Sequence, residues 1–219
     1  MRVPFPATIA AITLCLAAST AQSAERAGET TRVQQASFQR ETLIPWPLDP
    51  GDEIYRDALV YTERYGSLEM RLDDGSNLTL GPNSDVVIDR YVYAPETSTG
   101  EAAISLTQGV LRMVSGRIPQ ENVSLSTGIA QIGIRGTDFT LDRNTEGIVK
   151  IWVDDGAVAA TPVQSGQEFV FAAPAFAICT VSSCEQSNPE PKPVVFPVKP
   201  AGVEDDNDDD RGDGGGGGY

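Results

Sequence analysis

The chain has 219 residues, with 31 acidic and 16 basic side chains, no histidine and a formal net charge of −15. The lack of histidine excludes Ser-His-Asp and Cys-His catalytic systems, histidine metal ligands and an imidazole pH switch. The negative charge argues against a nucleic-acid partner, because phosphate neutralisation needs clustered basic side chains and Lys150, Lys192 and Lys199 are scattered. Many glycines and prolines and few aromatic residues favour a turn-rich β protein.

Residues 1–24 have the composition of a secretory signal peptide. Arg2 supplies a positive start, residues 7–18 are mostly apolar, and residues 19–24 are rich in small side chains, which predicts cleavage between Ala21 and Ala24. The apolar stretch is shorter than the roughly 18–20 residues that span a bilayer. No later segment reaches that length. The sequence therefore predicts an exported protein, periplasmic or at the cell surface, without a transmembrane segment in the mature chain.

After an N-terminal extension of residues 25–48, residues 49–172 are predicted to form a domain of short strands. Leu68, Met70 and Leu72 alternate with polar residues, which is the period of a half-buried strand. Asp74 and Gly75 then supply a turn, because glycine tolerates positive φ. Similar apolar segments follow at residues 78–80, 86–88, 104–106, 110–114, 123–125, 129–134, 139–141 and 148–153. The predicted fold class is all-β.

A strand–glycine–strand pattern recurs around Gly109 and Gly156, with a looser copy at Gly75. One interpretation is a set of hairpins, each with a glycine turn. The other is a β roll, sandwich or solenoid-like stack built from similar units.

The two cysteines that remain after signal cleavage lie in residues 173–185, which we predict to close the fold. An even pair in an exported protein indicates a disulfide between Cys179 and Cys184. Two cysteines without histidine make a poor zinc site, so we expect neither a metal nor another cofactor.

Residues 186–219 are predicted to be a Pro-rich linker followed by an acidic, Gly-rich disordered tail. Residues 204–213 contain seven acids and one arginine, a local charge of −6. Calcium binding is the alternative, but the loop lacks the glycine that an EF-hand needs at its sixth position.

Five segments, in order along the chain, resemble the FecR domain family. They are residues 66–84 with an Asp-Gly-Ser turn and a Gly-Pro-Asn-Ser ending, residues 106–112 with a central glycine, residues 129–139 around Arg135-Gly136-Thr137, and residues 155–158 and 165–169. The resemblance covers roughly residues 49–172. One departure is Ser126-Thr127-Gly128, where the family usually has Thr-Pro.

This resemblance implies a periplasmic β module. The family's best-known members are membrane regulators of iron uptake, with a cytoplasmic anti-sigma segment and a transmembrane helix before the module and a receptor-contacting region after it. Because a cleavable signal peptide is expected here instead, the mature protein is not expected to contact a cytoplasmic sigma factor.

The segment Arg135-Gly136-Thr137 is the candidate binding motif. In one hypothesis the guanidinium of Arg135, a planar fork of donors, contacts a partner or ligand. In the other, Arg135 pairs with an acid such as the nearby Asp138, and Gly136 forms a structural bulge.

No catalytic residues are assigned. Asp73/Asp74 and Asp154/Asp155 are adjacent acids, but neighbours on a strand point to opposite faces, which disfavours them as an acid–base couple. The favoured function is a non-enzymatic binding module with a protein partner in the cell envelope, in sensing or signalling. The alternatives are a surface or matrix display protein that uses the β domain as a spacer and, least favoured, a carboxylate-dependent hydrolase.

Overall fold

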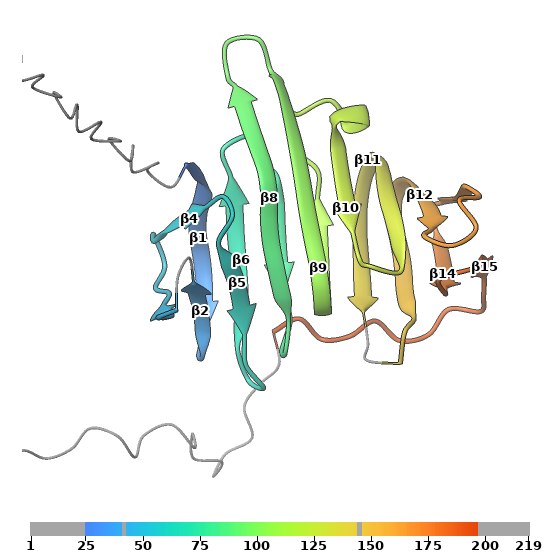
Figure 1. Ribbon diagram of the computed structural model, residues 1–219, viewed down its shortest axis with the longest axis horizontal. Helices are drawn as coiled ribbons and strands as arrows, with labels where there is room; N and C mark the ends of the chain where they lie inside the picture. The colour runs from blue at the N-terminus through green and yellow to red at the C-terminus, as the bar shows by residue number, and fades with distance from the viewer. Residues whose placement is uncertain (1–24, 41–42, 144–145, 197–219) are drawn as a thin grey trace, which may run out of the picture.

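The computed structural model describes residues 25–40, 43–143 and 146–196, and the regular secondary structure of these residues is almost entirely β-strand (Figure 1). The predicted signal peptide and the acidic tail lie outside the described residues. The strands are β1 (Arg26–Gln34), β2 (Ser37–Arg40), β3 (Trp46–Pro47), β4 (Glu53–Tyr55), β5 (Leu59–Thr62), β6 (Ser67–Leu72), β7 (Asn77–Leu80), β8 (Asp85–Ala94), β9 (Thr99–Val114), β10 (Val123–Ser126), β11 (Ala130–Arg143), β12 (Val149–Pro162), β13 (Phe169–Ala172), β14 (Ala175–Cys179) and β15 (Cys184–Gln186); a 3-10 turn, η1 (Gln120–Asn122), precedes β10. The all-β prediction is confirmed.

All the strands belong to one hydrogen-bonded sheet that is folded into two layers. Layer A contains β3, β2, β5, β8, the first half of β9, β10, the first half of β11, the second half of β12, and β13. Layer B contains β4, β1, β6, β7, the second half of β9, the second half of β11, the first half of β12, β14 and β15. Neighbouring strands are antiparallel except β9 and β10. The three long strands β9, β11 and β12 therefore join the layers into a roll.

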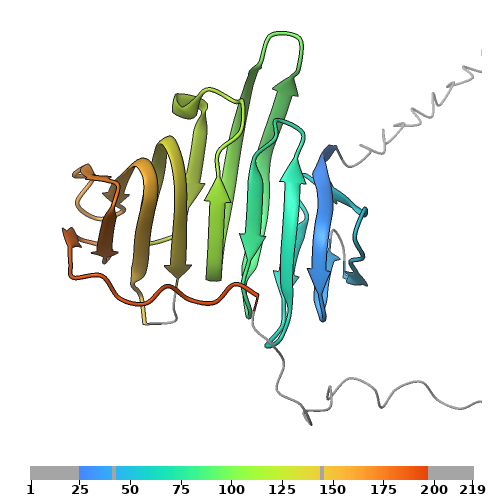
Figure 2. The ribbon, with the colours of Figure 1, turned by 180° about the vertical axis from the view of Figure 1, so that it is seen from behind.

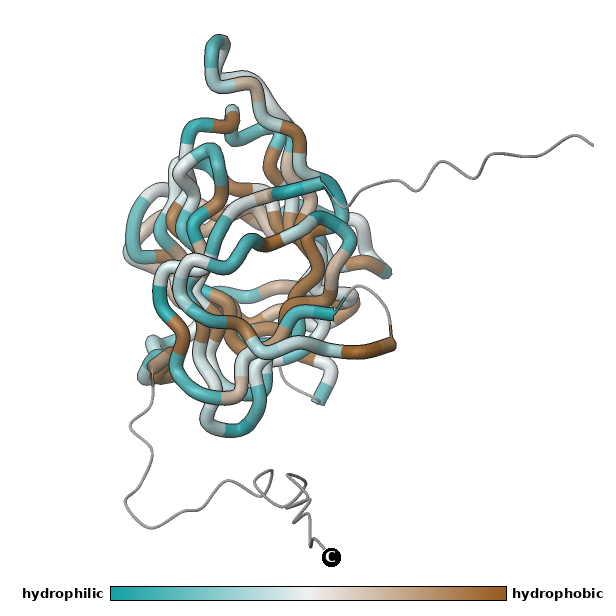
Figure 3. The backbone as a smooth tube through the Cα atoms, turned by 90° about the vertical axis from the view of Figure 1, so that its left-hand side faces the viewer, coloured by the Kyte–Doolittle hydropathy of each residue, from teal (hydrophilic) through white to brown (hydrophobic). Residues whose placement is uncertain are grey.

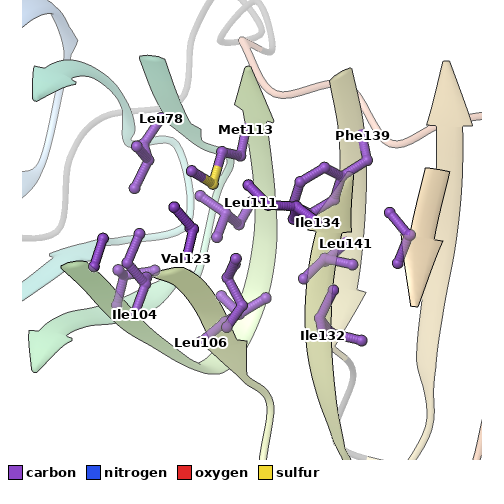
Figure 4. Close-up of a cluster of buried hydrophobic side chains, with 14 of the residues drawn as sticks. Leu78, Ile104, Leu106, Leu111, Met113, Val123, Ile132, Ile134, Phe139 and Leu141 are labelled. Carbon is purple, nitrogen blue, oxygen red and sulfur yellow. The ribbon is translucent and has the colours of Figure 1, made fainter. Parts of the chain in front are cut away.

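The hydrophobic core lies between the two layers. Figure 4 shows side chains from β7, β9, β10 and β11 meeting there, and Figure 3 shows the backbone winding around the space that the core fills. Phe139, Met113 and Leu111 are among the largest side chains that are fully buried. Burying apolar area at about 25 cal/mol per Å² is the main stabilising contribution to such a core.

Each of the three long strands exchanges its inward and outward positions at a glycine. In a straight strand every second side chain faces the core. Here the core-facing residues change from even-numbered to odd-numbered positions, or from odd to even, part-way along the strand. The buried residues are Ile104 and Leu106 before Gly109, with Leu111 and Met113 after it; Ile132 and Ile134 before Gly136, with Phe139 and Leu141 after it; and Ile151 and Val153 before Gly156, with Val158 and Ala160 after it. The glycines are the corners at which each strand passes from one layer to the other.

Only glycine fits these corners. Gly109, Gly136 and Gly156 have φ of +85°, +64° and +71°, a region that L side chains rarely adopt. A Cβ on Gly156 would overlap the carbonyl oxygen of Gly136, and one on Gly109 would overlap Ser84. The corners of β11 and β12 are therefore stacked directly on each other.

Two features of the chain differ from the sequence-based expectation. Residues 104–106 and 110–114, expected as two strands, are one bent strand, and so are the apolar segments on either side of Gly136 and Gly156. The hairpin interpretation of Gly109 and Gly156 is thus wrong, because β9 and β12 each continue through the glycine as a single strand. Residues 25–48, expected as an extension, supply β1, β2 and β3 of the same sheet. β1 pairs with β4 and β6, β2 pairs with β5, and β3 pairs with β2.

Gly156→Ala is expected to destabilise the protein by at least about 3 kcal/mol, because the new methyl group would overlap a backbone carbonyl at a positive φ. This corresponds to a fall in Tm of roughly 10 °C. Gly133→Ala is the matched control, since Gly133 also lies in a long strand but a Cβ there would approach only Ala159, at 3.8 Å. Equal melting temperatures for the two variants would contradict the corner assignment.

Candidate functional site

The predicted binding motif lies at the corner of β11, and its three residues have different environments. Arg135 is the last residue of the straight first half of β11, and its side chain is 60% exposed on the outside of layer A. Gly136 follows at the corner, where the pairing of β11 with β12 shifts register. Thr137 is 3% exposed. Only Arg135 is therefore available to a partner.

Thr137 holds the corner to the segment that follows β9. Its backbone N–H donates to Ser115 Oγ at 3.2 Å, and its carbonyl oxygen accepts from the Ser115 N–H at 3.1 Å. Within the described residues, its buried hydroxyl has no hydrogen-bond partner. The backbone of Thr137 thus serves the fold, while the structure assigns no role to its hydroxyl.

Arg135 does not pair with Asp138. Asp138 accepts two hydrogen bonds from Arg112, from Nε at 3.0 Å and from a terminal nitrogen at 2.6 Å. This bidentate contact raises the pKa of the Arg112 guanidinium. The acid facing Arg135 is Glu168, at 3.8 Å, and both side chains are more than half exposed. Such surface pairs contribute little free energy, so the contact leaves the donors of Arg135 accessible.

Arg135 borders a shallow groove of about 510 Å³ on the outer face of layer A. Its floor is a row of small residues, because Ser124, Gly133 and Ala159 are direct partners across β10, β11 and β12. Gln120 and Glu121 of η1 and Glu168 of the loop before β13 also line the groove, as do Gln131 and Thr161. The groove therefore joins an open, mostly small-residue floor to a polar rim containing both signs of charge.

Sequence reasoning missed the lining residues other than Arg135. Gln120, Glu121 and Glu168 come from segments far apart in the chain, and only the pairing of β10, β11 and β12 brings them together. One sequence signal for the groove was available. Each of β10, β11 and β12 has a small residue at an outward position, where a strand normally carries a larger polar side chain.

Asp74, predicted as a turn residue, is a buried hydrogen-bonding centre. Its Oδ1 accepts from the Ser76 N–H at 3.0 Å and from the Tyr91 hydroxyl at 3.2 Å. Its Oδ2 accepts from Ser76 Oγ at 2.8 Å and from the Ile118 N–H at 3.3 Å. Burial, and then the Asp74 carboxylate, raise the pKa of Tyr91. Gly75 beside it has φ of +89°, so this pair forms the turn between β6 and β7.

Ser84 is a structural residue to which sequence reasoning gave no role. Its hydroxyl donates to the carbonyl oxygen of Gly81 at 2.7 Å and accepts from the N–H of Val110 at 2.8 Å. It lies under Gly109, where a side chain would overlap it. The Gly-Pro-Asn-Ser segment therefore packs directly against the Gly109 corner.

The other candidate acids have structural contacts. Asp73 pairs with Arg26 at 2.6 Å, and Asp154 pairs with Lys192. Among the residues that the structure describes, no three His, Cys, Asp or Glu side chains are grouped so that they could hold a metal ion. Across the same residues, no helix has the length and apolar character needed to cross a membrane.

The predicted disulfide between Cys179 and Cys184 is present. The two cysteines are cross-strand partners where β14 turns into β15, at one edge of layer B. The bond therefore closes the last hairpin of the sheet.

Comparison with known proteins finds a family match within the domain. Residues 58–159 match the family model described as FecR protein, which confirms the resemblance expected from the sequence. Two crystal structures of a candidate anti-sigma factor from Parabacteroides distasonis ATCC 8503, at 1.65 and 2.50 Å resolution, are similar to this chain at 13% identity, with a TM-score of 0.47. The similarity covers 59% of this chain and 59% of that one. None of the curated proteins compared with the chain matches it.

Asp74→Asn is expected to destabilise the protein by about 2–3 kcal/mol, because the amide places a donor where a carboxylate oxygen accepts two hydrogen bonds. The control is Asp73→Asn on the neighbouring exposed acid, whose surface ion pair is worth less than about 1 kcal/mol. Urea unfolding followed by circular dichroism measures both variants. A free energy of unfolding for Asp74→Asn within error of that for Asp73→Asn would refute the buried centre.

Proposed function

We propose, because the chain carries a FecR domain, that it is an exported, non-enzymatic module that binds a protein partner in the cell envelope and takes part in signalling there. The observation that carries this proposal is the exposed Arg135 beside the open groove of layer A. The Cys179–Cys184 disulfide supports export, since such bonds persist in oxidising compartments.

The groove suits a polypeptide better than a small molecule. It is shallow and open, whereas small-molecule sites are concave and bury most of their ligand. Its floor of Ser124, Gly133 and Ala159 allows a partner's backbone to approach the sheet closely. Arg135 offers a bidentate contact to an acidic side chain of that partner.

A binding role also agrees with the contacts of the acids that a hydrolase would need. Asp74 is fixed by four hydrogen bonds to its carboxylate, and Asp73 and Asp154 are paired with basic side chains. A carboxylate-dependent glycoside hydrolase needs two carboxyl groups that face one substrate position, about 5–9.5 Å apart. The adjacent acids instead serve the β6–β7 turn and the outer face of β12.

Arg135→Ala is expected to weaken partner binding at least about tenfold, the loss that follows from removing a charged hydrogen bond worth about 1.5 kcal/mol or more. Tm is expected to change by less than about 2 °C, because the side chain is 60% exposed and weakly paired. Affinity capture from an envelope extract, with quantitative mass spectrometry of the retained proteins, identifies the partner, and titration then gives its Kd.

Arg71→Ala is the matched control, since Arg71 is an exposed arginine on the outer face of layer B. Equal recovery of partners by the wild type and both variants would contradict a binding role for Arg135. A large fall in the Tm of Arg135→Ala would instead assign Arg135 to the fold. Capture of no partner by the wild type would favour the display function, in which the domain is a spacer.

A further inference from the structure

The Pro-rich segment that follows β15 lies across the outer face of layer B. Residues 187–196, here called the strap, run from the β15 edge toward β1 without joining the sheet (Figure 2). At its start, the Ser187 N–H donates to the carbonyl oxygen of Phe176 at 2.9 Å. At its end, Phe196 lies 3.9 Å from the guanidinium carbon of Arg32 in β1, measured to the ring centroid. The strap thus spans most of the width of layer B.

The strap buries an aromatic pair that belongs to the outside of the sheet. Trp152 and Phe176 are direct partners on β12 and β14, with ring centroids 5.0 Å apart. Trp152 alternates with Ile151 and Val153, which face the core, so it faces outward. It is nevertheless only 5% exposed, and its indole N–H donates to the carbonyl oxygen of Glu190 at 2.8 Å. An aromatic patch that would face solvent is therefore covered by the chain's own segment.

Charged side chains on both sides of Trp152 fix the direction of the strap. Lys150 and Asp154 lie two residues before and after Trp152 and share its outward face. Glu190 pairs with Lys150 at 2.6 Å, and Lys192 pairs with Asp154. The hydrogen bond to Glu190 raises the pKa of Lys150. The surface therefore recognises an acid followed two positions later by a base.

The chemistry of the strap is that of an exchangeable peptide ligand. Pro189, Pro191 and Pro193 cannot donate backbone hydrogen bonds, and such segments favour extended polyproline II structure at low entropic cost. Pro-rich peptides commonly bind aromatic-lined surfaces in this conformation. Because the strap forms no ladder with any strand, its release would leave the sheet hydrogen bonds intact.

We propose that the outer face of layer B, around Lys150, Trp152, Asp154 and Phe176, is a recognition surface for an extended Pro-rich peptide, and that the strap is its built-in occupant. The ligand is a partner's segment with an acid two residues before a lysine and an apolar end, and it binds by displacing the strap. This surface lies on the opposite face from the Arg135 groove, so the proposal goes beyond the proposed function.

The first test uses the full-length chain with the change Trp46→Phe. The chain has two tryptophans, so Trp152 is the one that remains. In this background, E190K/K192E replaces both ion pairs with like-charge contacts without changing net charge. We expect Trp152 to become several-fold more accessible to acrylamide quenching than in the parent chain. The further change K150E/D154K restores both pairs in reversed form and should restore shielding. Unchanged quenching in E190K/K192E would overturn the strap contact, as would failure of the fourfold variant to restore it.

The second test adds a fluorescent synthetic peptide of residues 187–196 and follows its anisotropy. A tethered strap competes at an effective concentration on the order of millimolar, so the wild-type chain should bind the peptide at least about tenfold more weakly than E190K/K192E. The fourfold variant should bind least, because its strap is paired and its surface charges oppose the peptide. Equal affinity for all three chains, or no binding to E190K/K192E, would overturn the recognition surface. Neither readout depends on the partner of Arg135.

Discussion

The two-layered structure depends on one local constraint, the positive φ of glycine at the corners of β9, β11 and β12. Each corner exchanges the inward and outward faces of its strand. Ile132 and Phe139 therefore face the same core although they are an odd number of positions apart. The corners of β11 and β12 touch, since the carbonyl oxygen of Gly136 occupies the position of a Gly156 side chain. Ser84 occupies the corresponding position at Gly109. A side chain at Gly109 or Gly156 would therefore overlap backbone atoms that support these corners.

The motifs that resemble the FecR family are thus largely requirements of the fold. Asp74 joins the β6–β7 turn to Tyr91 and to the segment before η1, and Ser84 supports the corner of β9. Within Arg135-Gly136-Thr137, two residues build the corner of β11 and one projects outward. The corner therefore places Arg135 at the border of the groove. The two outer faces differ in consequence: layer A presents small residues and an accessible guanidinium, while layer B carries aromatic residues already covered by residues 187–196.

Much of the fold could be predicted from local pattern. Alternation in Leu68, Met70 and Leu72 gave the strand period, and an even cysteine pair gave the disulfide. The corners were not predicted, because a strand–glycine–strand pattern is the same for a hairpin and for a bend in a continuous strand. The decisive signal was that the core-facing positions change from even to odd between Leu106 and Leu111. The composition of the Pro-rich segment predicted that this segment forms no hydrophobic core of its own. It did not predict that the segment packs against Trp152. That contact was signalled by an aromatic residue at an outward position. The small outward residues of the groove floor are visible in the sequence, but only the long-range pairing of β10, β11 and β12 brings them together.

The three corners separate a face of the sheet that the chain itself covers from a face that is open. Hydroxyl-radical footprinting of the chain, free and bound to its captured partner, tests this most directly because it reports each side chain separately. If the partner binds the open face, Gln131, Arg135 and Thr161, which all line the groove, are protected in the complex. Reactivity at these three positions that is the same in the complex as in the free chain would contradict it.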